Sequence, residues 1–352
     1  LIRGDILACF NLQPAILGHL KRKEQSKSNM VTNIFKVAGP KNPIRTNDDD
    51  CAVVLDTETN QILQYDQISD SKKFSLNLEK ISLDPKKVMS TEIRYDLVDT
   101  QISICTSDVL QVCFEHFEFN HFRDDFMDNL LNSEISEDHA FAYILKDSEY
   151  AQRVFDYRTY YLTSQDFLSR WLYPITATTQ DLRIKDRTTY TYSDFNVYRG
   201  SKSDVAYDAK VNDTVIIGHD TIIGSQTTVA NSSIGRNCRI GKNVTIEGAV
   251  LWDNVTVEDG AVIKKAILCD NVVVESQAVI KPGCVLAQKV VVRAKATVPE
   301  KTLVMFSENS DKEHELFKKG KVYDDESFKL ANDEYIGSQP SFLTTVLEYE
   351  ES

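Results

Sequence analysis

The chain lacks several features that define large classes of protein. Its 53 acidic and 40 basic side chains give a formal net charge of -13, so no overall positive field favours direct nucleic-acid binding. No apolar run is long enough to span a bilayer, and no signal peptide opens the sequence, so we expect no membrane partner. Its seven cysteines lie far apart without a C-x-x-C pair, which favours reduced thiols in the cytosol over disulfides or a zinc site.

Two further absences concern chemistry and completeness. No Ser/His/Asp or Cys/His arrangement of a nucleophilic enzyme is visible, so we predict no catalytic residue, metal or other cofactor. The sequence has no initiator methionine, and Leu1 to Leu7 reads as the inside of a strand. We therefore interpret the chain as a fragment whose first part is missing.

What the sequence does contain is a six-residue repeat. Aliphatic residues recur from Val205 to Val298 in steps of six, except for steps of five at 229 to 234, 246 to 251 and 263 to 268. The short steps are 17 residues apart, the length of a coil with two six-residue sides and one five-residue side. Such repeats bury a continuous core only when successive coils stack.

The residues between the aliphatic positions fit the same fold. A second small or β-branched residue, such as Val215 or Thr221, follows four positions later and should also point inward. Gly, Asn and Asp occupy the intervening corners, where they tolerate a tight backbone. The pattern predicts a left-handed parallel β-helix over residues 203–299. A two-sheet sandwich would need longer periods.

The chain before the repeat alternates predicted helices with predicted strands, which indicates an α/β domain with a mixed sheet over residues 1–175. The expected elements are a helix over 13–27, strands over 30–38, 51–55, 62–65 and 101–105, and helices from 108 towards 118, over 124–131 and over 164–171. A polar linker over 176–202 precedes the β-helix. Residues 300–352 are expected to form an acidic, mostly extended tail, with a short docking piece over 342–347.

An α/β domain that leads into a left-handed β-helix resembles the sugar-nucleotide pyrophosphorylases, whose first domain has the nucleotidyltransferase (Rossmann-like) fold. Asp5 matches the position of their first metal-binding aspartate. The best match to their second, D-x-G-T-P, is Asp156-Tyr157-Arg158-Thr159-Tyr160, where arginine replaces glycine and tyrosine replaces proline. We therefore interpret Asp5 and Asp156 as residual positions of an inactive, N-terminally incomplete nucleotidyltransferase-like domain.

More specific stretches resemble the epsilon subunit of eukaryotic translation initiation factor two-B, a guanine nucleotide exchange factor. These stretches are Ser164 to Pro174 with its Arg-Trp-x-Tyr-Pro core, Asn196 to Gly200, Glu92 to Leu97 and Arg123 to Phe126. The resemblance implies a scaffold and docking role in exchanging GDP for GTP on initiation factor two. It also implies a cytoplasmic location and a heterodimer with the gamma subunit that joins the alpha, beta and delta subunits. The family's catalytic HEAT-type domain is expected to be absent from this sequence.

Two places are candidate partner contacts. The family motif Asn-Phe-Asp, tied to exchange, matches His116-Phe117-Glu118, in which the phenylalanine and a carboxylate are kept. Packing of Phe114, Phe117 and Phe119 against the helix end is the alternative. Trp252 is expected on the outer face of a coil, where an interface would cover it. His219 is expected to be a solvated corner residue and not the general base of an acyltransferase, because the repeat has no long insertion.

Two alternatives stay open from the sequence. The chain fits a sugar-nucleotide pyrophosphorylase that has lost its N-terminal phosphate-binding loop, or the gamma subunit of the same factor, which shares the architecture. The missing upstream residues would separate the enzyme from the exchange-factor subunit. Continuation past Ser352 into a helical domain would favour epsilon over gamma.

Overall fold

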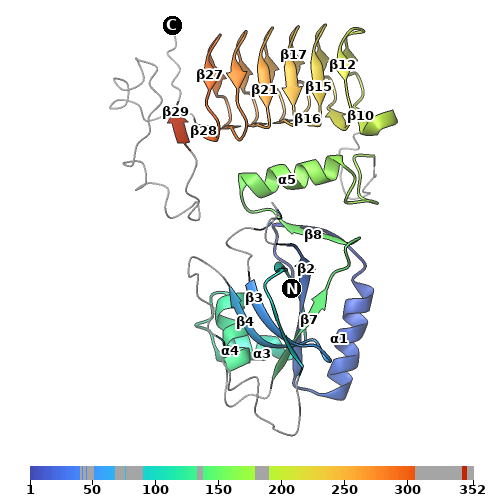
Figure 1. Cartoon of the computed structure of the whole chain (residues 1–352), viewed down its shortest axis with the longest axis vertical. Coiled ribbons are helices and arrows are strands. Elements are labelled where there is room, and N and C mark those ends of the chain that lie inside the picture. Colours follow the sequence, from blue (N-terminus) through green and yellow to red (C-terminus); the bar gives the residue numbers. More distant parts are fainter. Residues whose placement is uncertain are drawn as a thin grey trace. The chain divides into compact units, whose positions relative to one another are not determined.

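The computed structural model describes residues 1–39, 42, 45, 51–67, 76, 90–132, 138–178, 190–305 and 343–346. The chain divides into two compact units, Leu1–Leu162 and Thr163–Ser352, each shown within Figure 1. Across these described residues, no helix is both long and apolar enough to cross a membrane.

The first unit is built on a six-stranded mixed sheet with the order β5-β3-β4-β7-β2-β6. Its strands are β2 (Asn29–Val37), β3 (Cys51–Asp56), β4 (Gln61–Gln67), β5 (Thr91–Arg94), β6 (Leu97–Cys105) and β7 (His139–Ile144). β2 and β7 run parallel, and the other neighbours run antiparallel. The predicted mixed α/β sheet is confirmed, including the hairpin of β3 and β4.

Different elements cover the two faces of this sheet. Apolar residues of α3 (Asp108–Glu115) and α4 (Met127–Asn132) share one core with Val31 and Phe35 of β2. Ile34 of β2 instead joins a core with residues of β1 (Ile6–Cys9) and with Ala151 of β8 (Tyr150–Arg153), an antiparallel ribbon. The alternation of side chains along a strand explains why one strand serves both cores.

One predicted helix forms as expected, and three others differ from their predicted bounds. α1 (Gln13–Gln25) forms as expected, with a proline in its first turn and Arg22 and Lys23 in its last. α3 ends at Glu115, three residues before its expected end, and a π-helical turn (Phe122–Phe126) precedes α4. The helix expected over 164–171 is wrong at both ends, because α5 spans Tyr157–Leu168.

The second unit contains the predicted left-handed parallel β-helix, which is confirmed. Its three sheets each pair a strand with the strand one coil later (Figure 1). The first sheet contains β10 (Val197–Arg199), β13 (Val215–Ile217), β16 (Ser232–Ile234), β19 (Val250–Leu251), β22 (Ile267–Leu268), β25 (Val285–Leu286) and β28 (Thr302–Met305). The second contains β11 (Asp204–Val205), β14 (Ile222–Ile223), β17 (Arg239–Ile240), β20 (Thr256–Val257), β23 (Val273–Val274) and β26 (Val291–Val292). The third contains β12 (Lys210–Val211), β15 (Thr228–Ala230), β18 (Thr245–Glu247), β21 (Val262–Lys264), β24 (Val279–Ile280) and β27 (Thr297–Val298).

The strand register confirms the predicted coil lengths. Val250 pairs with Ile267 seventeen residues later, within the region that contains five-residue steps. Ile267 pairs with Val285 eighteen residues later, where all steps are six. The aliphatic positions and the small residues between them form one buried core, from Val215 to Val304.

The corner glycines serve a different purpose from the one predicted. A Cβ on Gly235 would lie 2.5 Å from the carbonyl carbon and oxygen of Trp252, on the next coil. Gly218 and Gly224 meet the backbone of the next coil in the same way. These glycines therefore permit close stacking of coils. The left-handed backbone lies two residues later, for example at Asp220 and Asn237.

The stacked strands extend beyond the predicted limits of 203–299. β10 pairs with β13, and β9 (Thr191–Ser193) pairs with β10 across the turn Asp194–Asn196. At the other end β29 (Leu343–Val346) lies within the expected docking piece and pairs in parallel with β28. Residues 179–189 of the expected linker and residues 306–342 and 347–352 of the expected tail lie outside the described residues. The proposed division into domains stays a prediction.

Candidate functional site

The His116-Phe117-Glu118 segment forms a turn directly after α3. His116 occupies the C-cap position of α3, and its backbone N–H donates to the carbonyl of Val112. The Nδ1 atom of His116 lies 3.0 Å from Oε1 of Glu118. A backbone N–H and the His116 ring lower the pKa of the Glu118 carboxyl, so this group is a stable surface anion.

Phe117 lies on the surface and not in the core. It is 89% exposed, Phe114 is 83% exposed and Leu110 is 63% exposed. These three residues are named here the α3 stripe. Phe114 is four positions after Leu110 and so lies on the same side of α3, and Phe117, three positions later, follows the end of the helix. The opposite side packs Val109, Val112 and Cys113 into the core.

Aromatic stacking anchors the His116-Phe117-Glu118 turn to the core. The His116 ring stacks on Phe119 with centroids 4.9 Å apart, and Phe119 meets Phe126 edge-on at 6.4 Å. Of the three phenylalanines proposed to pack the helix end, Phe119 therefore does so, whereas Phe114 and Phe117 do not. A large exposed apolar stripe held on a rigid base is typical of a protein-contact surface.

A buried ion pair anchors the segment that carries Phe126. The Arg123 guanidinium donates to Oδ1 of Asp99 at 2.9 Å, and its Nε lies 2.6 Å from Oδ2. It also donates to Asn33 and Ser103, each at 2.8 Å. Burial alone would lower the pKa of Arg123, but the Asp99 carboxylate raises it, so the guanidinium stays charged. The sequence did not identify this network, because its members come from three separate elements.

The two residual nucleotidyltransferase positions have structural partners. Asp5 immediately precedes β1, and its carboxylate accepts a hydrogen bond at 2.8 Å from Nε of Arg153, on the paired strand β8. Asp156 Oδ1 accepts the backbone N–H of Thr159 at 2.6 Å, which is an N-terminal cap of α5. Within the described part of the chain, no group of three or more His, Cys, Asp or Glu side chains is arranged to hold a metal.

Trp252 lies at a corner of the β-helix and is partly buried. Its backbone N–H donates to the carbonyl of Leu268 on the next coil at 2.8 Å, and its carbonyl accepts from the Cys238 thiol at 3.1 Å. It directly follows the last residue of β19, a central strand of the first sheet. A role for its side chain in an interface stays a prediction.

His219 is buried, so its predicted solvated environment is wrong. Only 8% of the residue is exposed. Its Nδ1 accepts from the backbone N–H of Ser201 at 2.8 Å, and its ring lies 5.1 Å from that of Tyr190. These contacts come from the segment before the repeat, which the repeat pattern could not reveal. With Nδ1 held as an acceptor, the ring packs the first coil.

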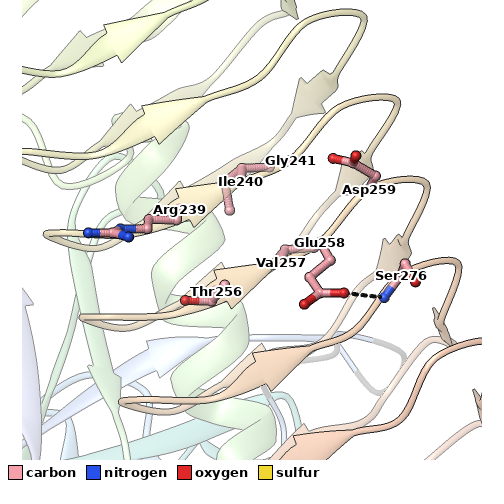
Figure 2. A pocket seen from close by; sticks show the side chains of 8 residues that line it. All are labelled: Arg239, Ile240, Gly241, Thr256, Val257, Glu258, Asp259 and Ser276. Carbon is pink, nitrogen blue, oxygen red and sulfur yellow. Dashed lines mark hydrogen bonds between the residues drawn. The ribbon is translucent and has the colours of Figure 1, made fainter.

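A shallow groove of about 350 Å³ crosses two coils of the second sheet (Figure 2). Its two lining carboxylates already have partners in the coil stack. Glu258 Oε2 accepts from the backbone N–H of Ser276 at 3.0 Å, and Asp259 Oδ1 accepts from that of Lys242 at 2.6 Å. The carboxylates therefore hold successive coils together, and we assign no ligand to this groove.

Comparison with known proteins agrees with the geometry. The family model described as the eIF2B subunit epsilon left-handed β-helix domain matches residues 194–298. The chain is 33% identical over 218 residues to translation initiation factor eIF2B subunit epsilon of Dictyostelium discoideum, covering 62% of this chain and 30% of that protein. It is 31% identical over 258 residues to the protein of the same name from Schizosaccharomyces pombe, covering 72% and 36%. The chain thus spans about a third of the length of these relatives.

Among solved structures, one similar fold is a variant of perosamine N-acetyltransferase from Caulobacter crescentus. The identity is 12%, the TM-score is 0.29, and the match covers 30% of this chain and 51% of that one. No functional conclusion follows from a likeness at this level.

Proposed function

The chain is related to the epsilon subunits of translation initiation factor eIF2B, and from that relationship we propose that it is the scaffold and substrate-docking part of such a subunit. In this proposal it supports the exchange of GDP for GTP on initiation factor two without forming or breaking covalent bonds itself. The single observation that carries the docking role is the exposed α3 stripe, which ends at Phe117 in the position of the family's exchange motif.

The β-helix supports the scaffold half of the proposal. Coils of 17 and 18 residues stack from β10 to β28 without an inserted loop. An uninterrupted solenoid presents long, rigid, repetitive faces that suit assembly. We propose that the partners are the gamma subunit in a heterodimer, then the alpha, beta and delta subunits, in the cytoplasm, with Trp252 at one of these interfaces.

The alternative of an active pyrophosphorylase has weaker support. Nucleotidyl transfer needs carboxylates that are available to hold Mg²⁺ against phosphates. Asp5 is engaged by Arg153, and Asp156 caps α5 through Thr159. Their present contacts favour a structural role for both residues. No observation favours the gamma subunit, and both curated relatives described above are epsilon subunits.

The docking role can be tested with Phe117→Ala in the full-length subunit, measured as the rate of GDP release from initiation factor two. A contact residue of this exposure should slow release by about tenfold, the effect of losing an interface residue worth about 1.4 kcal/mol. Leu17→Ala is the matched control, because Leu17 is 57% exposed on α1 of the same unit. Unchanged release by a folded Phe117→Ala variant would exclude the contact.

A further inference from the structure

The last coil of the β-helix carries lysine at all three of its corners. From Thr214 onwards each corner of the solenoid has one residue with a left-handed backbone, and these residues stack in three columns. The columns are Lys202, Asp220, Asn237, Asn254, Asn271 and Lys289; Gln226, Asn243, Gly260, Gln277 and Lys295; and Thr214, Asn231, Gly248, Lys265, Gly283 and Lys301. Lys289, Lys295 and Lys301 are named here the lysine ring.

A left-handed backbone suits glycine and asparagine better than lysine. Lys289, Lys295 and Lys301 have φ values of 62°, 61° and 56°. Side chains with a Cβ pay a steric cost in this region, which asparagine partly offsets by local hydrogen bonding. Lys202 and Lys265 have the same backbone on other coils, so the last coil is distinguished by carrying a lysine at all three of its corners.

The ring makes one end of the β-helix basic in an acidic chain. Residues 272–305 contain five basic and two acidic side chains, whereas residues 203–220 contain one basic and four acidic ones. All three ring lysines are exposed. Among the ion pairs of the described residues, none involves a ring lysine, and the neighbouring Arg293 pairs with Glu275.

The sequence supplies an oppositely charged segment at the same end. Residues 307–352 contain 12 acidic and five basic side chains, and they are joined directly to the last coil through Met305. A tethered segment has a high effective concentration at a nearby site. β29, four residues of this segment, already pairs with β28 of the last coil, although its neighbours lie outside the described residues.

We propose that the lysine ring is a docking site for the acidic segment 307–352 of the same chain. The contact is electrostatic, between exposed ammonium groups and the carboxylates of residues 308–351. This inference is independent of the proposed role in nucleotide exchange.

The first test is zero-length carbodiimide cross-linking of the full chain, which joins lysine amines to carboxylates in direct contact. Links from the lysine ring to residues 308–351 are expected at about 0.01 M salt, and their loss is expected at about 1 M salt, where charges are screened within about 3 Å. Lys210 and Lys242, exposed on other coils, serve as internal controls. Links distributed evenly over all exposed lysines, or links only between molecules, would overturn the proposal.

The second test removes the ring charge without harming the fold. The variant Lys289→Asn, Lys295→Asn and Lys301→Asn gives each corner an asparagine, as Asn271, Asn243 and Asn231 do on earlier coils of the three columns, so its melting temperature should be equal or higher. Glu-specific proteolysis within residues 308–351 should become several-fold faster. The control variant Lys202→Asn, Lys210→Gln and Lys242→Gln removes the same charge elsewhere and should leave this rate unchanged.

Two results of the second test would contradict the proposal. Equal proteolysis of the ring variant, the control variant and the unaltered chain would show that the ring does not hold the segment. Ring-dependent binding of a labelled oligoribonucleotide by the full chain, measured by fluorescence anisotropy, would instead make the ring a nucleic-acid site.

Discussion

Replacing Arg123 by methionine should strongly destabilise the first unit. Arg123 and Asp99 have side chains that are 7% and 0% exposed, and the substitution would leave the Asp99 carboxylate buried without its cation. Removing one partner of a buried pair costs about 3–5 kcal/mol. Tyr65 still donates to Asp99 at 3.0 Å, as does the backbone N–H of Gln101 at 2.7 Å. These two donors place the expected cost near the lower end, at about 3 kcal/mol.

The assay must report on the first unit alone. Both tryptophans, Trp171 and Trp252, belong to the second unit, so intrinsic tryptophan fluorescence would not detect the change. Hydrogen exchange measured on peptides from β2 and β6 reports the opening free energy of the sheet that holds Asn33, Asp99 and Ser103. Those peptides should exchange about 100-fold faster in the variant, because each 1.4 kcal/mol is a factor of about ten.

The matched control is Arg94→Met. Arg94 also makes a two-point contact with a carboxylate, donating to Asp96 at 2.6 and 2.7 Å. That pair is partly exposed, and exposed pairs contribute about 0–1 kcal/mol. If Arg123→Met accelerates exchange no more than Arg94→Met does, burial of the network contributes nothing special and the reasoning is refuted.

Three further predictions follow from the fold and the site. Gly235→Ala should destabilise the β-helix by about 1–3 kcal/mol, because the new Cβ would overlap the backbone of Trp252. Urea unfolding followed by tryptophan fluorescence measures this loss. The control Gly4→Ala should have no effect, because the space around Gly4 is open. Burial raises the pKa of the Cys238 and Cys269 thiols to about 11. Iodoacetamide at neutral pH should therefore label the partly exposed Cys9 and Cys113 first. Labelling of Cys238 before these two would contradict its burial. Incubation of the full-length protein with nucleoside triphosphate, sugar phosphate and Mg²⁺ should release no pyrophosphate, and release that Asp5→Asn abolishes would restore the enzyme alternative.

The β-helix could be predicted closely because its information is local and repeated. Each coil repeats the same inward positions, so the three five-residue steps locate every strand within a residue or so. The corner glycines were expected to provide a tight turn. Gly235 instead allows close approach to the backbone of the next coil, and Asn237, two positions later, has the left-handed backbone. A one-dimensional pattern locates such residues without distinguishing close approach from backbone freedom.

The α/β unit was harder because its interactions are non-local. Asp156 was compared with a metal-binding aspartate and its capping of α5 was overlooked, which explains why the start of that helix was missed. Burial of His219 depends on Tyr190 and Ser201, which precede the repeat. The buried pair of Arg123 and Asp99 joins a turn to a strand 24 residues earlier, and no spacing rule relates the two. Of the candidate contact residues, Phe117 was expected within the end of a helix, whereas it follows α3, and the sequence could not show that it is exposed.

The most direct test of the central claim is a native mass measurement of the assembly purified through the full-length subunit from its natural source. We expect a complex that contains the gamma subunit together with the alpha, beta and delta subunits, because the proposed role is that of a scaffold. The full-length protein recovered only as a lone monomer would contradict that role.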